Sequence, residues 1–101
     1  MKKKSVFEII PGVGKSISRD FLDLGYRFVQ ELKTENPEQM YTKLCSLRSQ
    51  NIDRCVLYVF REAVYFANSV NPESELLKWW NWKDSNLKNI PNNERMLIHD
   101  K

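Results

Sequence analysis

The residues with the clearest chemical use form one short run, Ile10-Pro11-Gly12-Val13-Gly14-Lys15. Glycines let a chain turn without Cβ clashes, and the first amides of a following helix have no intrahelical acceptor. Those amides and the helix dipole together favour an anion. Lys15, and Arg19 one turn later, add positive charge. The spacing therefore predicts an anion site that suits a phosphate group.

We expect the amides of Gly12, Val13 and Gly14 to hold one phosphate beside Lys15, with support from Arg19. The full predicted set is Gly12, Val13, Gly14, Lys15, Ser16 and Arg19. Contacts of this kind recognise a nucleic-acid backbone and not its base sequence. Two other uses of the run stay open, namely docking onto another protein and a tight helix-helix connector without a ligand.

Nucleotide-binding loops fit the same residues poorly. Gly14-Lys15-Ser16 resembles the end of a P-loop, but the glycine required five positions before Gly14 is Ile9. The dinucleotide fingerprint fails as well, because Ile17 occupies its third glycine position. We therefore expect no nucleotide hydrolysis.

A second set of candidates lies on the longest apolar segment. Arg54, Tyr58, Arg61 and Tyr65 recur at helical spacing and share one stripe. Arg54 and Arg61 are therefore candidates for a secondary nucleic-acid surface. We favour the alternative that the stripe is the solvent edge of a core helix, with half-buried tyrosine rings and Arg61 paired to a carboxylate.

Trp79, Trp80 and Trp82 allow two interpretations. Exposed indole rings serve as platforms for bases or for a protein partner. Leu76, Leu77 and Trp80 would also form an apolar face that docks a helix, which is the commoner use. Because Trp79 and Trp80 are adjacent, we expect one of the two rings to point outward.

The sequence gives no support for a catalytic site or a metal site. The sole histidine, His99, lies in a polar C-terminal stretch, and Cys45 and Cys55 fit no metal-ligand spacing. Buried free thiols are the favoured state of both cysteines. We expect a protein that is not an enzyme and that needs no cofactor or metal.

Composition bounds the class of protein. A chain of 101 residues with 42% hydrophobic and 12% aromatic residues predicts one packed domain. The net charge of +3 lies entirely in residues 1–33, which hold seven Lys/Arg against four Asp/Glu, whereas residues 34–101 hold nine of each. No apolar stretch is long enough for a signal peptide or a membrane span. We expect a cytoplasmic protein without membrane contact.

The elements that position these residues read as helices throughout. Ser5 and Glu8 have the spacing of a capping box, Asp53 is placed to cap the longest helix, and Asn-Pro-Glu start signals occur at 36–38 and 71–73. Helices are predicted over 5–10, 15–24, 28–33, 37–47, 53–68 and 71–83. In the fourth, Met40, Tyr41, Leu44, Cys45 and Leu47 are expected to face inward. The predicted domain covers 1–84, and 85–101 is predicted to be a polar, loosely ordered tail.

The run at 10–15, followed by Phe21-Leu22 and Gly25, resembles the helix-hairpin-helix motif of DNA repair and recombination proteins. Asp53-Arg54-Cys55-Val56-Leu57-Tyr58-Val59-Phe60-Arg61 and Lys78-Trp79-Trp80-Asn81-Trp82-Lys83-Asp84 resemble the small bacterial "pathogenicity locus" helix-hairpin-helix family, which is similar in layout to the C-terminal domain of the competence regulator TfoX. The resemblance covers roughly residues 5–84. It implies an all-α domain of five or six helices that binds DNA.

The layout is also like a doubled helix-hairpin-helix domain. Its second hairpin would be Arg48–Ile52, which contains no glycine and is therefore degenerate. We predict a protein that contacts DNA at one hairpin without strong sequence preference. The alternative is a protein-protein interaction module that uses the hairpin or the Trp-rich C-terminal helix. The sequence leaves the protein partner and the oligomeric state open.

Overall fold

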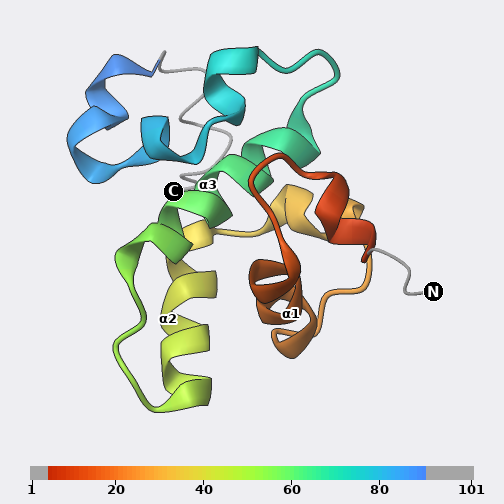
Figure 1. The fold of residues 1–101 in the computed structure, drawn as a ribbon, viewed down its shortest axis with the longest axis vertical. Helices are drawn as coiled ribbons and strands as arrows, with labels where there is room; N and C mark the ends of the chain where they lie inside the picture. The colour runs from red at the N-terminus through yellow and green to blue at the C-terminus, as the bar shows by residue number, and fades with distance from the viewer. Residues whose placement is uncertain (1–4, 91–101) are drawn as a thin grey trace.

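The computed structural model describes residues 5–90, and every element within them is helical (Figure 1). The elements are η1 (Val6–Ile9), α1 (Lys15–Asp23), η2 (Val29–Thr34), α2 (Pro37–Arg48), α3 (Arg54–Asn68), η3 (Ser74–Leu77), η4 (Trp79–Trp82) and η5 (Asp84–Asn89). The η elements are short 3₁₀ helices. The predicted all-α class is confirmed, although only three of these elements are α-helices.

Three helix starts form where the sequence predicts them. The Ser5 and Glu8 side chains exchange hydrogen bonds with the backbone at the start of η1. The Asn36 side chain accepts from the amides of Glu38 and Gln39 and begins α2. The Asp53 side chain accepts from the Cys55 amide and begins α3. Each side chain satisfies amides that have no acceptor inside the helix.

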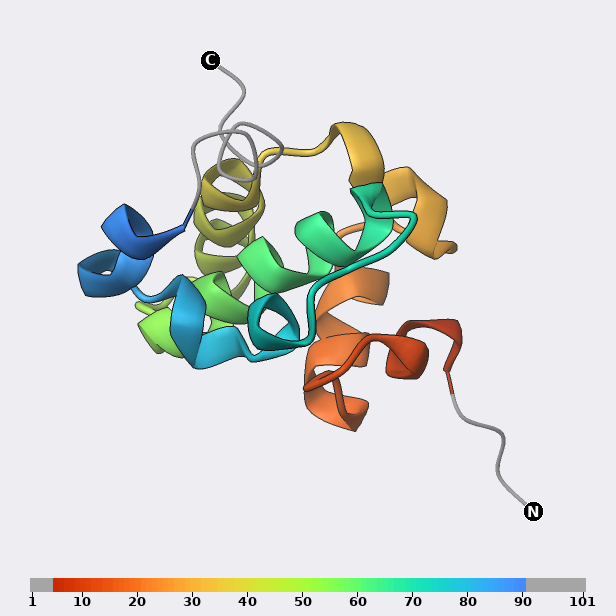
Figure 2. The ribbon, with the colours of Figure 1, turned by 90° about the horizontal axis from the view of Figure 1, so that it is seen from above.

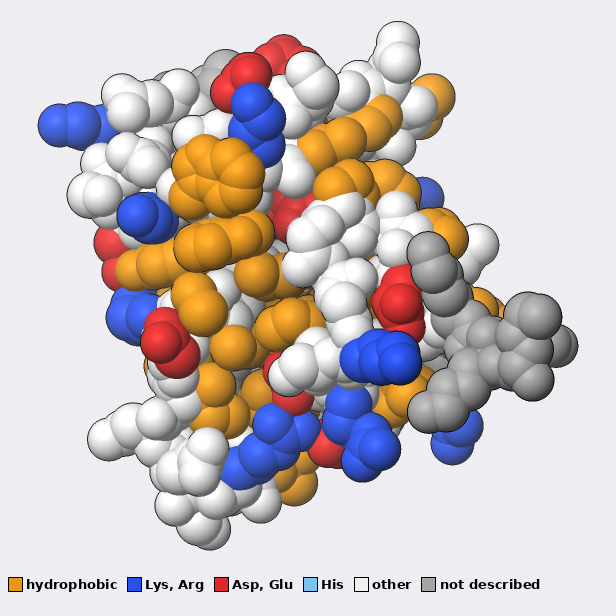
Figure 3. All heavy atoms as spheres, viewed as in Figure 1, with side chains coloured by type: hydrophobic (Ala, Val, Ile, Leu, Met, Phe, Trp, Pro, Cys, Tyr) orange, Lys and Arg blue, Asp and Glu red, His pale blue; other side chains and the backbone are white. Residues whose placement is uncertain are grey.

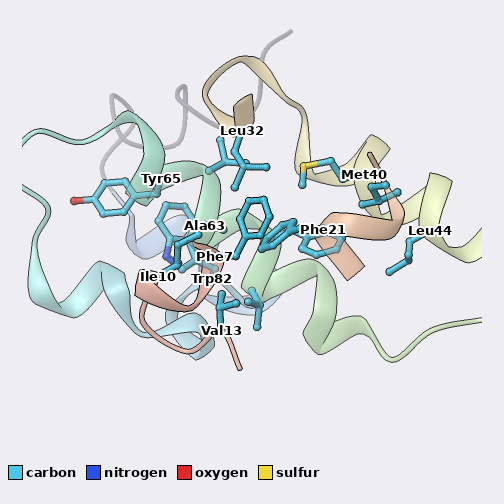
Figure 4. Close-up of a cluster of buried hydrophobic side chains, with 14 of the residues drawn as sticks. Phe7, Ile10, Val13, Phe21, Leu32, Met40, Leu44, Ala63, Tyr65 and Trp82 are labelled. Carbon is cyan, nitrogen blue, oxygen red and sulfur yellow. The ribbon is translucent and has the colours of Figure 1, made fainter. Parts of the chain in front are cut away.

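Helix α3 is the centre of the fold, and the other elements surround it (Figure 2). Its buried residues are Leu57 and the run from Val59 to Tyr65. A line of aromatic rings joins it to the N-terminal elements, because Phe21 lies 4.9 Å from Phe7 and 5.2 Å from Phe60, measured between ring centroids. Figure 4 shows Phe7 and Phe21 in the same buried cluster as Ile10 and Val13, which lie at the turn between η1 and α1. The hairpin is therefore anchored on the core.

The single helix predicted over 71–83 is wrong. The segment forms η3 and η4, with Lys78 extended between them, and the Asn71-Pro72-Glu73 signal caps no α-helix. Leu76 and Trp82 are both buried, and a continuous α-helix would turn residues six apart about 120° away from each other. The break brings both side chains onto the core, where the Trp82 indole N–H donates to the Leu76 carbonyl at 2.8 Å.

Two smaller predictions also need correction. Leu47 does not face inward but is 56% exposed, because the C-terminal end of α2 lies away from α3 (Figure 1). The domain boundary predicted at residue 84 is too early, because Ile90 belongs to the core and is 3% exposed. The rest of the predicted tail, 91–101, lies outside the described residues.

Candidate nucleic-acid interface

The predicted site lies on the turn between η1 and α1. The Val13 amide donates to the Ile10 carbonyl at 3.0 Å and closes a turn whose third residue is Gly12. Gly12 has φ +83°, a backbone region that favours glycine. Gly14 is extended, with φ −100°, and forms the N-cap of α1. We call Pro11–Gly14 the hairpin.

Val13 does not fit the role predicted for it. Its amide is engaged by the Ile10 carbonyl, and its side chain is 6% exposed within the core. A donor that already has a partner in the turn is not free for a phosphate. Val13 is therefore the anchor of the hairpin, which removes it from the predicted phosphate ligands.

The Gly12 amide has no acceptor within residues 5–90, as its predicted role requires, and further free donors lie along the chain after Val13. Among the described residues, the amides of Gly14, Lys15 and Ser16 have no hydrogen-bond acceptor. Gly14 offers no side-chain cap, and the first turn of α1 contains no acidic residue. A Cβ added at Gly14 would meet nothing within 4 Å, so the approach to these amides is open. The start of α1 has the geometry of an anion site.

The two predicted cations stand beside these amides without partners. Lys15 and Arg19 are exposed, and neither forms an ion pair within residues 5–90. Several of the other cations form ion pairs. Arg48, for example, pairs with Asp20 at 2.7 Å and Asp23 at 2.6 Å. Positive charge at the hairpin is therefore available to an outside anion.

The turn between α2 and α3 differs from the hairpin before α1. Ser49 there adopts the left-handed region with φ +51°, and the Asp53 carboxylate fills the start of α3 by accepting from the Cys55 amide at 2.9 Å. A carboxylate in that place occupies the position that a phosphate would take and repels it. Of these two turns, the one before α1 leaves its helix start open among residues 5–90, whereas the one before α3 does not.

The structure does not bring Arg54 and Arg61 together on one exposed surface, because only Arg54 is exposed. Arg61 is 2% exposed, pairs with Glu38 and Asp84, and donates to the Trp82 carbonyl at 2.8 Å. Arg54 is exposed but pairs with Asp84 at 2.8 Å. Pairing of Arg61 with a carboxylate agrees with the favoured interpretation. A solvent edge does not, because Arg61 is buried and Tyr65 is 1% exposed.

Glu62 lies beneath the hairpin, and the sequence gives no sign of it. Its side chain is fully buried on α3, and neither carboxyl oxygen has a hydrogen-bond partner among the described residues. A Cβ at Gly12 would lie 3.3 Å from Glu62 Oε1. Burial raises the pKa of Glu62 to about 9, so the carboxyl is neutral at pH 7 and places no negative charge under the hairpin.

The three tryptophans have different surroundings. Trp82 is fully buried and Trp79 is partly buried against the core, which agrees with the packing interpretation. A Cβ at Gly12 would lie 3.5 Å from Trp79 Cδ1, so Trp79 contacts the hairpin. One ring of the adjacent pair points outward as expected, but it is Trp80, which is 47% exposed, so the predicted docking face of Leu76, Leu77 and Trp80 is wrong at Trp80. Hydrophobic side chains accordingly gather on the face that carries η4 (Figure 3).

The remaining predictions concern metals, thiols and membranes. Cys45 and Cys55 are free and partly buried, not fully buried. Within residues 5–90, no cluster of His, Cys, Asp or Glu could hold a metal ion. None of the helices in this part of the chain is long and apolar enough to cross a membrane. His99 lies outside the described residues.

Comparison with known proteins gives one match. A family model described as "Pathogenicity locus" matches residues 1–88, which is most of the chain and includes the hairpin and the tryptophans. Neither a curated protein nor a solved structure matches.

Proposed function

The chain belongs to the Pathogenicity locus family. From the geometry of its first hairpin, we propose that it is a DNA-binding helix-hairpin-helix protein that holds backbone phosphate without reading base sequence. The phosphate ligands are the amides of Gly14, Lys15 and Ser16, with the Lys15 and Arg19 side chains beside them. η1, the hairpin and α1 form the motif. We also propose that the layout of this domain is similar to that of the C-terminal domain of TfoX.

One observation carries this proposal, namely the open start of α1. No acidic side chain lies in its first turn, and within residues 5–90 its first amides have no acceptor and its two cations form no ion pair. The start of α3, in contrast, is filled by Asp53. A phosphate at α1 gains both charge and hydrogen bonds, which makes it the best-matched ligand.

Binding through one hairpin should be weak and sensitive to salt. One phosphate held by the hairpin, with one or two cations, releases few counterions, so we expect the logarithm of the association constant to fall with a slope of roughly −1 to −2 against the logarithm of salt concentration. We infer a role in binding and not in catalysis. A dimer or a second domain would raise the affinity by adding sites.

The test is duplex binding, measured by fluorescence anisotropy over a range of salt concentrations. Lys15→Glu reverses the charge beside the amides and should abolish binding at low salt. Lys43→Glu makes the same change in net charge at an exposed lysine of α2 and should reduce affinity only slightly. Equal affinities for the two variants, or no binding by the wild type at low salt, would refute the proposal.

The alternative function is docking onto another protein through the hairpin or the tryptophans. The half-exposed Trp80 and the 66% exposed Ile9 of η1 are the observations that favour it. Capture of a protein partner that survives Lys15→Glu, together with absent duplex binding, would support this alternative over the DNA proposal.

A further inference from the structure

The exposed ring of Trp80 is separated from the hairpin by a single side chain, that of Trp79. Trp79 contacts Gly12, and the Trp79 and Trp80 rings meet edge to face, with centroids 5.7 Å apart and planes at 84°. Trp79 packs against the core, whereas Trp80 is 47% exposed. The edge-to-face contact gives the outer ring a defined orientation.

The backbone that carries this ring is also held in place. The Trp80 carbonyl accepts from the Asn86 amide side chain at 3.0 Å, and the Asn81 side chain donates to the Glu75 carbonyl at 2.7 Å. These contacts fix η4 relative to η3 and η5. Trp80 is therefore presented on a braced segment, as a preorganised binding group would be.

The surroundings of the ring suit a nucleic-acid strand. Lys83 follows Trp80 by three residues, is exposed, and enters no ion pair within residues 5–90. On its inner side, Trp80 contacts Trp79, which in turn contacts Gly12 of the hairpin. An exposed aromatic ring close to positive charge is the combination found in grooves that bind single strands, where bases stack on aromatic rings.

We propose that Trp80 is a stacking platform for an unpaired base of the strand whose phosphate is held at the hairpin. This inference rests on the proposed function and specifies which kind of nucleic acid is bound. Inside a duplex both faces of a base are covered by its neighbours, so the ring can stack only on a single strand, an overhang or an unpaired nucleotide. The preferred ligand is therefore nucleic acid with unpaired bases next to a bound phosphate.

The experiment compares a labelled single strand, the matching blunt duplex, and that duplex with an unpaired overhang. Trp80→Ala should weaken single-strand and overhang binding on the order of tenfold and leave blunt-duplex binding unchanged. Trp80→Phe keeps a flat ring and should retain most of the affinity. Phe28→Ala removes another exposed aromatic ring, 59% exposed at the start of η2, and should change none of the three affinities.

The outcomes separate this inference from the proposed function. If Lys15→Glu abolishes all binding but Trp80→Ala has no effect, the stacking platform is refuted and the hairpin proposal stands. If the wild type binds none of the three nucleic acids, the hairpin proposal fails. If Trp80→Ala removes capture of a protein partner and leaves oligonucleotide binding unchanged, the ring belongs to a protein interface and the inference is overturned.

Discussion

At the scale of single residues, the two glycines of the hairpin have different roles. Gly12 has a positive φ, and the place where its Cβ would stand is lined by Glu62 and Trp79. Gly14 has an extended backbone that any residue adopts, and open space surrounds its missing Cβ. Gly12 is therefore required by the fold, whereas Gly14 leaves room for a ligand.

Alanine substitutions should separate these two roles. Gly12→Ala places a side chain at positive φ against Glu62 Oε1 and should lower the free energy of unfolding by about 1–3 kcal/mol. Gly14→Ala should stay within about 1 kcal/mol of the wild type while weakening phosphate binding. Urea denaturation and duplex binding measure the two effects. Similar losses of stability in both variants would contradict the assignment.

Glu62 provides a prediction on pH. The unfolded chain releases this proton near the ordinary pKa of 4.5, whereas the folded chain keeps it until the pKa of about 9. Between these values the folded state binds more protons, so stability falls as pH rises, by up to about 1.4 kcal/mol per pH unit. Below pH 4.5 the carboxyl is protonated in both states, and its contribution is constant.

The matched variant for this prediction is Glu62→Gln, which cannot ionise. The difference in free energy of unfolding between wild type and variant isolates Glu62 from the other carboxylates. We expect the wild type to lose stability steadily relative to Glu62→Gln as the pH rises from 5 to about 9. A difference that does not change with pH would show that Glu62 is ionised in the folded protein, contrary to its burial.

Sequence patterns predict these residues unevenly, for a physical reason. The caps at Ser5, Asn36 and Asp53 depend on partners within three positions, so local spacing is sufficient to find them. The turn glycines are found in the same way. Glu62 meets Gly12 only after α3 packs under the hairpin, a contact across 50 positions of the chain that leaves no local pattern.

At the scale of elements, the C-terminal 3₁₀ helices are held to α3 by polar contacts as well as by packing. Arg61 donates to the Trp82 carbonyl and pairs with Asp84 at 3.0 Å and with Glu38 of α2. One buried guanidinium therefore joins α2, α3 and the η4–η5 segment. The sequence places Arg61 on a helical stripe but does not show that this stripe is covered.

Removal of that guanidinium should loosen η4 and η5 in particular. Arg61→Met leaves the Trp82 carbonyl without a donor and should lower the free energy of unfolding by about 2–4 kcal/mol, with faster hydrogen exchange in η5. Arg54→Met removes an exposed pair to the same Asp84 and should cost less than about 1 kcal/mol. Equal losses in the two variants would argue against a linking role for Arg61.

The helix predicted over 71–83 shows where element prediction fails. A start signal and apolar residues at suitable spacing both favour a helix, and both are local. The conformation of the segment is determined instead by the packing of both Leu76 and Trp82 into one core. Side-chain hydrogen bonds, such as that from Asn81 to the Glu75 carbonyl, also contribute. Tertiary packing outweighs a weak local preference over so short a stretch.

At the scale of the whole molecule, the all-α class and the order of the elements through α3 follow from composition, caps and apolar periodicity. The arrangement does not, because it depends on how the faces meet. The molecule measures 38 × 31 × 21 Å, and α3 passes through its middle (Figure 2). The resulting asymmetry, with α1 open at its start and α3 closed by Asp53, is the feature on which the functional account depends.

The most direct test of that account is a titration of the isotopically labelled protein with a short duplex at low salt, followed through its backbone amide resonances. We predict that the largest shifts occur at Gly14, Lys15 and Ser16, with little change at Val13, whose amide is engaged by Ile10, or at Asp53 and Cys55. Shifts that concentrate at the start of α3, or that leave the start of α1 unchanged while DNA binds, would contradict the account.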